Sequence, residues 1–327
     1  MTHRISDIFS IQSPEDFRKL ALQTFKFQYS NNKVYRQFCD LLNIDPSEVK
    51  ELEEIPFLPI EFFKSHSIIS SEKDPVIIFT SSGTTGMQTS KHEVIDLEVY
   101  KKSFRKGFEN FYGNIEDYAV LALLPSYLER EGSSLIYMVE DIINRSGNPH
   151  SGFYLHDLDS LKEKLDYLES KQQKVLLIGV SFALLDLVEK YTFSLKHTIV
   201  METGGMKGRR KEMIRTELHE VLKKGFGVPV IHSEYGMTEL LSQAYSFGNG
   251  IFECPPWMQV LVRDPEDAQT LLPEGKSGGL NVIDLANIFS CSFIATQDLG
   301  KKLGDGKLEI LGRFDNSDIR GCNLMVF

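Results

Sequence analysis

Apolar and polar positions are patterned in three different ways along the chain. From about Pro14 to Leu42 the apolar side chains lie near one face of a helix, which predicts a helical segment. From Val76 to about Gly236 strand and helix patterns alternate, with predicted strands at Val76–Phe79, Tyr118–Leu124, Val175–Ile178, Thr198–Met201 and Pro229–His232. This alternation favours an α/β sheet with helices on its faces.

The segments between these strands carry helix signals of their own. Leucines recur at helical spacing over Leu158–Leu168. Ser133 or Ser134 is the expected cap of another helix, because a serine hydroxyl can accept from the first free backbone N–H groups. A further helix is expected from Lys207 to Lys224, ended by Gly225.

The pattern changes after about Gly248, where short apolar stretches are joined by Gly, Pro and Asp turns. The expected strands there are Trp257–Val262, Gly279–Leu285, Cys291–Thr296 and Lys307–Leu311. No long helical pattern intervenes between them. This part of the chain is therefore expected to form a β-rich subdomain or barrel.

Composition limits the class of protein. The 327 residues carry a net charge of -10, so phosphate-rich partners such as nucleic acid or an anionic membrane surface are disfavoured. Four scattered cysteines without a C-x-x-C pair exclude a zinc-knuckle spacing and favour a reducing compartment. The longest apolar stretch, Val175–Val188, is too short and interrupted to span a bilayer, and the N-terminus lacks a signal-peptide core. We therefore expect a soluble, cytoplasmic protein.

A loop of small hydroxyl residues and glycines follows the first predicted strand. Its residues are Thr80, Ser81, Ser82, Gly83, Thr84, Thr85 and Gly86. Glycines let backbone N–H groups approach a ligand closely, and hydroxyls add donors for phosphate oxygens. The loop does not fit the Walker pattern, and alone such a loop is more often a surface turn.

Further segments add side chains that suit a nucleotide. Tyr235 and Glu239 follow a predicted strand, where a tyrosine can stack on a base and a carboxylate can hold Mg²⁺. The pair Gly204–Gly205 would let a flat ring approach the backbone closely. Asp298 suits a ribose diol, and Arg313 suits ribose or phosphate.

Each of these side chains also has an ordinary structural explanation. Taken singly, Tyr235 suits a core aromatic, and Glu239 suits an acid in the first turn of a helix. Asp298 suits a turn, and Arg313 with Asp315 suits a surface ion pair. The order of the segments decides between the two explanations.

In this order, the segments resemble the adenylate-forming superfamily of acyl-CoA synthetases, luciferases and peptide-synthetase adenylation domains. The resemblance covers roughly Val76 to the C-terminus and implies an α/β fold, the large N-terminal domain of that superfamily. It implies mixed sheets with helices to about residue 248 and the β-rich part from about 249 to 312. It also implies ATP and Mg²⁺ as cofactors. The implied site comprises a phosphate loop at Ser81–Gly86, an adenine site at Gly204, Gly205, Tyr235 and Gly236, the catalytic pair Thr238 and Glu239 (Glu239 also holding the metal), the ribose carboxylate Asp298 and the hinge residue Arg313.

Two departures from the superfamily's pattern narrow the resemblance. The usual G-x-P-K after the phosphate loop is replaced, since Met87-Gln88-Thr89 follow Gly86. The sequence also ends fifteen residues after Gly312, so residues 313–327 are expected to form a short tail in place of the superfamily's lid domain.

The acyl-protein synthetases of the LuxE type resemble this layout better. They are short and carry a cysteine near the C-terminus that accepts the acyl group. Cys322 matches that cysteine by position, and the nearby Arg320 would favour its thiolate. Leu124–Arg130 and Ser90–His92 also look like this branch.

The resemblance predicts an acyl-protein synthetase, an AMP-forming acid–thiol ligase. A carboxylic acid, expected to be a fatty acid, would become an acyl-adenylate and pass to Cys322 and then to a reductase or carrier protein. A phenylacetate-CoA-ligase-like enzyme that uses CoA is the alternative. Two other classes stay open, namely a non-catalytic nucleotide-binding scaffold and a serine hydrolase at Ser181, which lies in a near match to the nucleophile-elbow pattern.

Overall fold

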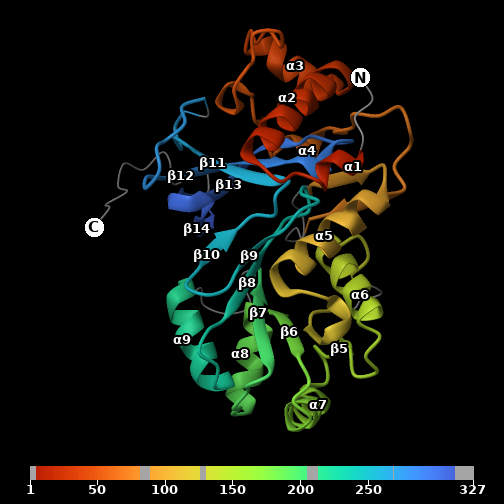
Figure 1. The fold of residues 1–327 in the computed structure, drawn as a ribbon, viewed down its shortest axis with the longest axis vertical. Coiled ribbons are helices and arrows are strands. Elements are labelled where there is room, and N and C mark those ends of the chain that lie inside the picture. The colour runs from red at the N-terminus through yellow and green to blue at the C-terminus, as the bar shows by residue number, and fades with distance from the viewer. Residues whose placement is uncertain (1–4, 82–88, 126–129, 205–212, 268, 314–327) are drawn as a thin grey trace. The chain divides into compact units, whose positions relative to one another are not determined.

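The computed structural model describes residues 5–81, 89–125, 130–204, 213–267 and 269–313. The chain divides into two compact units, each with its own core. Unit 1 contains residues 1–100, 239–242 and 253–327, and unit 2 contains residues 101–238 and 243–252. Figure 1 shows the elements of both units, and their labels are used below.

Unit 2 is built on a mainly parallel sheet with the strand order β9-β8-β7-β6-β4-β5. Its inner strands are near-continuous apolar runs that are buried along their length, as expected for a parallel sheet covered on both faces. Among the described strands in this order, β9 is the one that runs antiparallel, against β8. The strands are β4 (Ala119–Leu123), β5 (Gly152–Phe153), β6 (Val175–Val180), β7 (Thr198–Thr203), β8 (His232–Tyr235) and β9 (Ala244–Ser246), and β10 (Ile251–Glu253) neighbours β9.

Helices cover this sheet on both sides, so the predicted α/β class is confirmed. Figure 1 shows α8 and α9 on one side of the strands and α5 and α6 on the other. The helices are α5 (Leu97–Tyr112), α6 (Ser134–Ser146), α7 (Leu158–Ser170), α8 (Ser181–Lys190) and α9 (Arg215–Phe226). Ser133 is the N-cap of α6, as expected, and its hydroxyl accepts from the Ile136 N–H at 3.4 Å.

Two predicted boundaries in unit 2 are wrong. The helix expected to end at Gly225 continues to Phe226, and Gly227 is the terminating residue because it has a left-handed φ of 66°. Its described part begins only at Arg215, since Ile214 is extended. The strand expected at Pro229–His232 instead runs over His232–Tyr235, where it pairs with β7. Pro229 has no N–H to give to a sheet.

Unit 1 combines the N-terminal helices with an antiparallel sheet from the end of the chain. The sheet order is β11-β12-β13-β14, and β1 pairs parallel with β13. A separate two-stranded sheet joins β2 to β3. The strands are β1 (Leu58–Pro59), β2 (Ile77–Thr80), β3 (Lys91–Val94), β11 (Met258–Arg263), β12 (Ser277–Asp284), β13 (Phe293–Lys302) and β14 (Leu308–Arg313), and the helices are α1 (Ile5–Ile8), α2 (Pro14–Asn31), α3 (Lys33–Leu41) and α4 (Phe62–Ser65).

The single helix expected over Pro14–Leu42 is two helices. Asn32, which is buried, leaves the helical region with φ -101° and ψ 109°. Its side chain accepts from the Tyr35 N–H at 3.0 Å and so caps α3, while its amide donates to the Ser290 carbonyl at 3.1 Å. A capping side chain that also bonds outside the helix ends α2 within an otherwise continuous helical pattern.

The core of unit 1 joins residues that are far apart in sequence. The rings of Phe25, Tyr35 and Phe293 contact one another at centroid distances of 6.1 to 6.3 Å. The buried Gln28 side chain donates to the Asn287 and Ile288 carbonyls at 3.0 Å. Thus the first helices and the last strands form one core, whereas the domain division expected at residue 248 stays a prediction.

Within the described ranges, no helix has both the length and the apolar character needed to cross a bilayer.

Candidate functional site

The base of the predicted phosphate loop lies in unit 1, between β2 and β3. Ser82 to Gly86 lie outside the described residues, so Thr80, which ends β2, and Ser81 are the loop residues that can be placed. The Ser81 N–H donates to the Ser90 carbonyl at 3.1 Å, and the Ser90 N–H donates to the Ser81 hydroxyl at 2.9 Å. These two bonds hold the two ends of the loop together.

Glu239 is a buried carboxylate at the same place, with 5% of its surface exposed. Burial raises its pKa, because water is not available to solvate the charge, whereas a hydrogen bond with the Ser90 side chain and the charge of Arg313 act in the opposite direction. The carboxylate of Asp298 adds to the rise. Three residues predicted from separate segments are thus close enough to act on one another within unit 1.

Asp298 and Arg313 are cross-strand partners on β13 and β14. Arg313 Nε lies 3.4 Å from Asp298 Oδ1. The Asp298 side chain is 12% exposed and the Arg313 side chain is 65% exposed, so the guanidinium lies at the surface over a nearly buried carboxylate. The surface ion pair considered for Arg313 involves Asp315, which lies outside the described residues. Arg313 instead pairs with Asp298, which lies on strand β13 rather than in a turn, and this pair stands beside Glu239.

Two polar residues that the sequence analysis did not single out fix the backbone around Glu239. The Asp284 carboxylate accepts from the N–H groups of Leu241 and Ser242 at 2.7 and 3.0 Å. The Asn287 amide donates to the Glu239 carbonyl at 2.7 Å. Burial raises the pKa of Asp284 to about 6, and the hydrogen bonds from Ser242, Leu241 and Ala286 counteract it. Asp284 is the last residue of β12, and Asn287 follows it by three positions. Their place at the end of a strand is the one sequence signal that could have found them.

The predicted adenine side lies in unit 2, at the carboxyl ends of the neighbouring strands β7 and β8. Gly204 follows β7 with a left-handed φ of 67°, and Gly205 lies outside the described residues. Tyr235 ends β8, is 9% exposed, and its ring lies 6.2 Å from that of Phe252. The carboxyl ends of parallel strands are where open α/β sheets bind ligands. Thr238 is the last residue of this unit before the chain enters unit 1 at Glu239.

Position 236 requires a glycine because a neighbouring carboxylate approaches its backbone closely. A Cβ atom at Gly236 would lie 2.5 Å from Oε1 of Glu234. The Glu234 carboxylate in turn accepts from the Thr203 hydroxyl on β7 at 2.5 Å. Burial raises the pKa of Glu234 to about 7, the Thr203 bond lowers it, and the charge of Glu202 raises it further.

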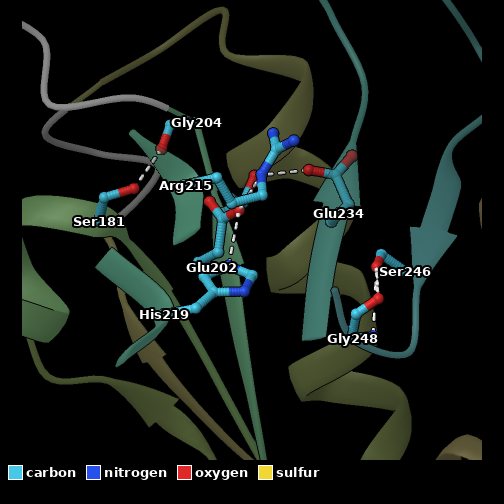
Figure 2. Close-up of polar contacts among 9 residues, drawn as sticks. Ser181, Glu202, Gly204, Arg215, His219, Glu234, Ser246 and Gly248 are labelled. Carbon is cyan, nitrogen blue, oxygen red and sulfur yellow. Dashed lines mark hydrogen bonds and ion pairs between the residues drawn. The ribbon is translucent and has the colours of Figure 1, made fainter. Parts of the chain in front are cut away.

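A second buried glutamate, Glu202, lies on the opposite face of these strands. Figure 2 shows the side chains of Arg215 and His219, from α9, directed at its carboxylate. The distances to Glu202 Oε1 are 3.3 Å from Arg215 Nε and 3.6 Å from His219 Nε2. Burial alone would raise the pKa of Glu202, but His219, Arg215 and Ser233 together lower it below its ordinary value. Neither glutamate carries a sequence pattern that predicts a functional role.

Ser181 does not have the environment of a hydrolase nucleophile. It is 2% exposed, and its hydroxyl donates to the Gly204 carbonyl at 2.7 Å, as Figure 2 shows. A nucleophile elbow instead presents its serine on a strained, exposed turn. Ser181 therefore joins the start of α8 to Gly204, the residue that follows β7.

Cys322, the predicted acyl acceptor, lies outside the described residues. The cysteines that the structure does describe are poor nucleophiles. Burial raises the pKa of Cys39 and of Cys254 to about 12 and raises that of Cys291 as well, so each is a neutral thiol at pH 7.

Comparisons with known proteins agree on one fold. An open form of 2-hydroxyisobutyryl-CoA ligase in complex with 2-HIB-AMP and CoA superposes with a TM-score of 0.69 at 12% identity, over 92% of this chain and 70% of that one. ATP-bound MatB from Rhodopseudomonas palustris gives a TM-score of 0.54 at 20% identity, over 72% of this chain. This chain spans about half of MatB, 47% of its length.

Sequence comparisons point to one branch. The family model "Acyl-protein synthetase, LuxE" matches residues 8–117. The long-chain-fatty-acid–luciferin-component ligase of Vibrio harveyi is 24% identical over 94% of this chain and 86% of its own length. The corresponding ligase of Photorhabdus luminescens is 32% identical over 73 residues, which are 22% of this chain and 62% of that protein.

The solved structures that superpose on this chain are adenylate-forming enzymes, and the chain shares their fold. In sequence, the chain resembles the LuxE-type acyl-protein synthetases, and this resemblance agrees with an AMP-forming ligase. The resemblance inferred from the motifs is confirmed.

Proposed function

We propose that this chain activates a long-chain fatty acid with ATP and transfers the acyl group to a protein thiol. The observation that carries the proposal is the grouping of Glu239, Asp298 and Arg313 in unit 1, at the base of the loop predicted to bind phosphate. The name of the Vibrio harveyi relative, which matches nearly the whole chain, supports a fatty acid as the substrate and a protein as the acceptor.

The reaction has two steps. A carboxylate oxygen of the acid attacks the α-phosphorus of ATP, the α–β phosphoanhydride bond breaks, and pyrophosphate leaves. A thiolate then attacks the carbonyl carbon of the acyl-adenylate, and AMP leaves with the carboxyl oxygen. Donors that are positioned beforehand would stabilise the charge that develops on the phosphoryl oxygens.

The nucleotide roles follow the position of each residue. Asp298 would bind the ribose diol, and the exposed guanidinium of Arg313 would reach ribose or phosphate. Tyr235, Gly236, Gly204 and Gly205 would flank adenine, while Thr238 and the predicted phosphate loop Ser81–Gly86 would contact the phosphates.

Glu239 would hold Mg²⁺. Among the described residues no three acidic, histidine or cysteine side chains form a cluster that could hold a metal ion. Mg²⁺ suits such a site, because it commonly binds one or two carboxylates and takes its other ligands from phosphates and water. The bound ion would neutralise charge on the phosphate oxygens, and Glu239 must be ionised to bind it.

Cys322 is the proposed acyl acceptor, and a reductase or carrier protein is the proposed final partner. The alternative acceptor is CoA, as in the ligase that gives the TM-score of 0.69. The test is the intact mass of the protein after incubation with ATP, Mg²⁺ and fatty acids of different lengths. An acyl mass gain that hydroxylamine removes and Cys322→Ser prevents would support the proposal.

Pyrophosphate release without a mass gain, followed by formation of acyl-CoA when CoA is added, would support the CoA alternative. If neither pyrophosphate nor a mass gain appears with any acid, the proposed function is wrong. Binding of ATP under those conditions would then favour the non-catalytic scaffold.

A further inference from the structure

The predicted ribose carboxylate, Asp298, lies on an irregular stretch of β13. Gly279 pairs with Leu299 and Asn281 pairs with Ala295, so β12 has one residue between the two pairs where β13 has three. The three residues are Thr296, Gln297 and Asp298. Such bulges re-aim side chains beside active sites, but here the extra residues lose their regular partners on β12, while Asp298 keeps its partner Arg313 on β14. On the β12 side, something other than the ladder has to hold the bulge.

A buried arginine on the neighbouring strand contacts this bulge. Arg263 ends β11, is 7% exposed, and donates from Nη2 to the Thr296 carbonyl at 2.8 Å. Its guanidinium occupies the space beside Gly279, where a Cβ atom would lie 1.9 Å from Nη1. A buried cation is costly to place in a sheet. The guanidinium of Arg263 reaches the bulge only because its cross-strand partner, Gly279, has no side chain.

Further contacts connect the Thr296 end of the bulge to Asp298. The Thr296 hydroxyl donates to the Leu280 carbonyl at 2.9 Å and accepts from the Asp298 N–H at 3.1 Å. The Gln297 amide donates to Glu61 at 2.7 Å, and the charge of Glu61 also acts on Arg263. Arg263 thus holds the first residue of a short hydrogen-bonded path that ends at the backbone of Asp298.

We propose that Arg263, seated against Gly279, is a positioning residue that holds the Thr296–Asp298 bulge and so sets the nucleotide's ribose specificity. The proposal rests on the proposed function, in which Asp298 binds the ribose diol. Arg263 touches the bulge and acts on the ribose only through Asp298.

Two variants test this from opposite sides. Arg263→Met removes the guanidinium, and Gly279→Ala keeps the arginine but displaces it from its seat. Arg263→Lys keeps a charge and one donor, and Arg18→Met is the matched control, because Arg18 is a half-exposed arginine of the same unit that pairs with Glu51. The readouts are amide hydrogen exchange across residues 293–302, and the ratio of Kd values for 2′,3′-dideoxy-ATP and ATP.

We expect the wild type to prefer ATP by about tenfold or more, as one hydrogen bond to a charged group predicts. Arg263→Met and Gly279→Ala should each reduce that ratio to within about twofold and accelerate exchange at Thr296–Leu299. Arg263→Lys should lie between these variants and the wild type, and Arg18→Met should match the wild type. The double variant Arg263→Met/Gly279→Ala should be no worse than either single variant, because both remove the same contact.

Unchanged exchange in Arg263→Met would overturn the proposal, as would accelerated exchange with an unchanged nucleotide ratio. The exchange measurement requires no nucleotide. A wild type that binds ATP but releases no pyrophosphate would contradict the proposed function, and the binding ratio would still decide the role of Arg263. If Gly279→Ala unfolds the protein, Arg263→Lys supplies the second variant.

Discussion

At the scale of single residues, the chemistry of this protein depends on carboxylates placed where water is scarce. Glu239, Asp284 and Glu234 all have pKa values raised chiefly by burial. Glu202 is buried as well, but neighbouring donors and charges lower its pKa. A glutamate therefore has a raised pKa on one face of the β7–β8 pair, at Glu234, and a lowered pKa on the other face, at Glu202.

Glu239→Gln should abolish formation of the acyl-adenylate, because an amide keeps the shape of the side chain but cannot hold Mg²⁺ by charge. The expected loss in pyrophosphate release is at least about 100-fold. Glu253→Gln is the control, since Glu253 is a half-exposed carboxylate of the same unit that pairs with Lys307 at 3.8 Å. Normal turnover in Glu239→Gln would show that the metal is held elsewhere.

The raised pKa of Glu239 also predicts the pH dependence of the reaction. The carboxylate must be ionised to bind Mg²⁺, so activity should be lost as the pH falls, with a midpoint above the ordinary value of 4.5. The measurement is the initial rate of pyrophosphate release between about pH 4 and 8 at ATP and Mg²⁺ concentrations well below saturation, because that rate reports the pKa of the free enzyme. An acid limb at or below pH 4.5 would contradict the assigned environment.

Glu234 and Glu202 should change stability with opposite signs. The folded-state pKa of Glu234 is raised from 4.5 to about 7, so its ionisation destabilises the fold as the pH rises through 7. Glu234→Gln should therefore increase the free energy of unfolding at pH 8, by up to about 3 kcal/mol. Urea denaturation at pH 5 and pH 8 measures this, and a gain that is equal at both values would rule out ionisation as its cause.

Glu202 stabilises the fold above the unfolded pKa of the carboxyl, and this contribution is lost as the pH falls through its lowered folded value. Glu202→Gln should cost about 1–3 kcal/mol at pH 7, because Arg215 loses its charged partner. The control is Glu217→Gln, because Glu217 is an exposed glutamate on α9, the helix that carries Arg215. Equal denaturation midpoints for the two variants would contradict a stabilising role for the Glu202 cluster.

At the scale of elements, periodicity and capping predicted much of the fold from the sequence. The inner strands of unit 2 were predictable because strands buried on both faces are continuous apolar runs, and α6 because Ser133 is a strong cap. The break at Asn32 was not, since its cause is a hydrogen bond to Ser290, far away in the sequence. The start of β8 was set by pairing with β7 rather than by local preference.

In the candidate site, too, residues with a local sequence signal were predictable and residues defined by distant contacts were not. Motif order located Glu239, Asp298 and Arg313, whose types and spacing carry chemistry. Sequence reasoning missed Asp284 and Asn287, because their role is to bond backbone groups more than forty residues away. It also gave no hint of Arg263, since a buried arginine at the end of a strand has no periodic signature.

At the scale of the whole molecule, the single tryptophan reports on one unit. Trp257 is 2% exposed, donates to the Ser242 hydroxyl at 3.1 Å, and contacts the ring of Phe9 at 5.0 Å, all within unit 1. Its fluorescence therefore follows the unfolding of unit 1, while much of the helical circular dichroism comes from unit 2.

Gln28→Leu should lower the urea midpoint of the tryptophan signal by an amount equivalent to about 1–3 kcal/mol. The reason is that the Ser292 N–H, which donates to Gln28 at 2.9 Å, is left buried without its acceptor. Gln37→Leu, on the exposed face of α3, should leave the midpoint unchanged. An effect of the same size on both variants would contradict the role given to Gln28.

The discontinuity of unit 1 has a consequence for synthesis on the ribosome. Gln28 emerges early, but Ser292, its partner, is translated 264 residues later. At about 5–20 residues per second this interval lasts roughly 13–53 s. Residues 101–238 are complete well before it ends, so the part of the chain made first finishes folding last. During that time the opening helices are the segment that chaperones and proteases meet.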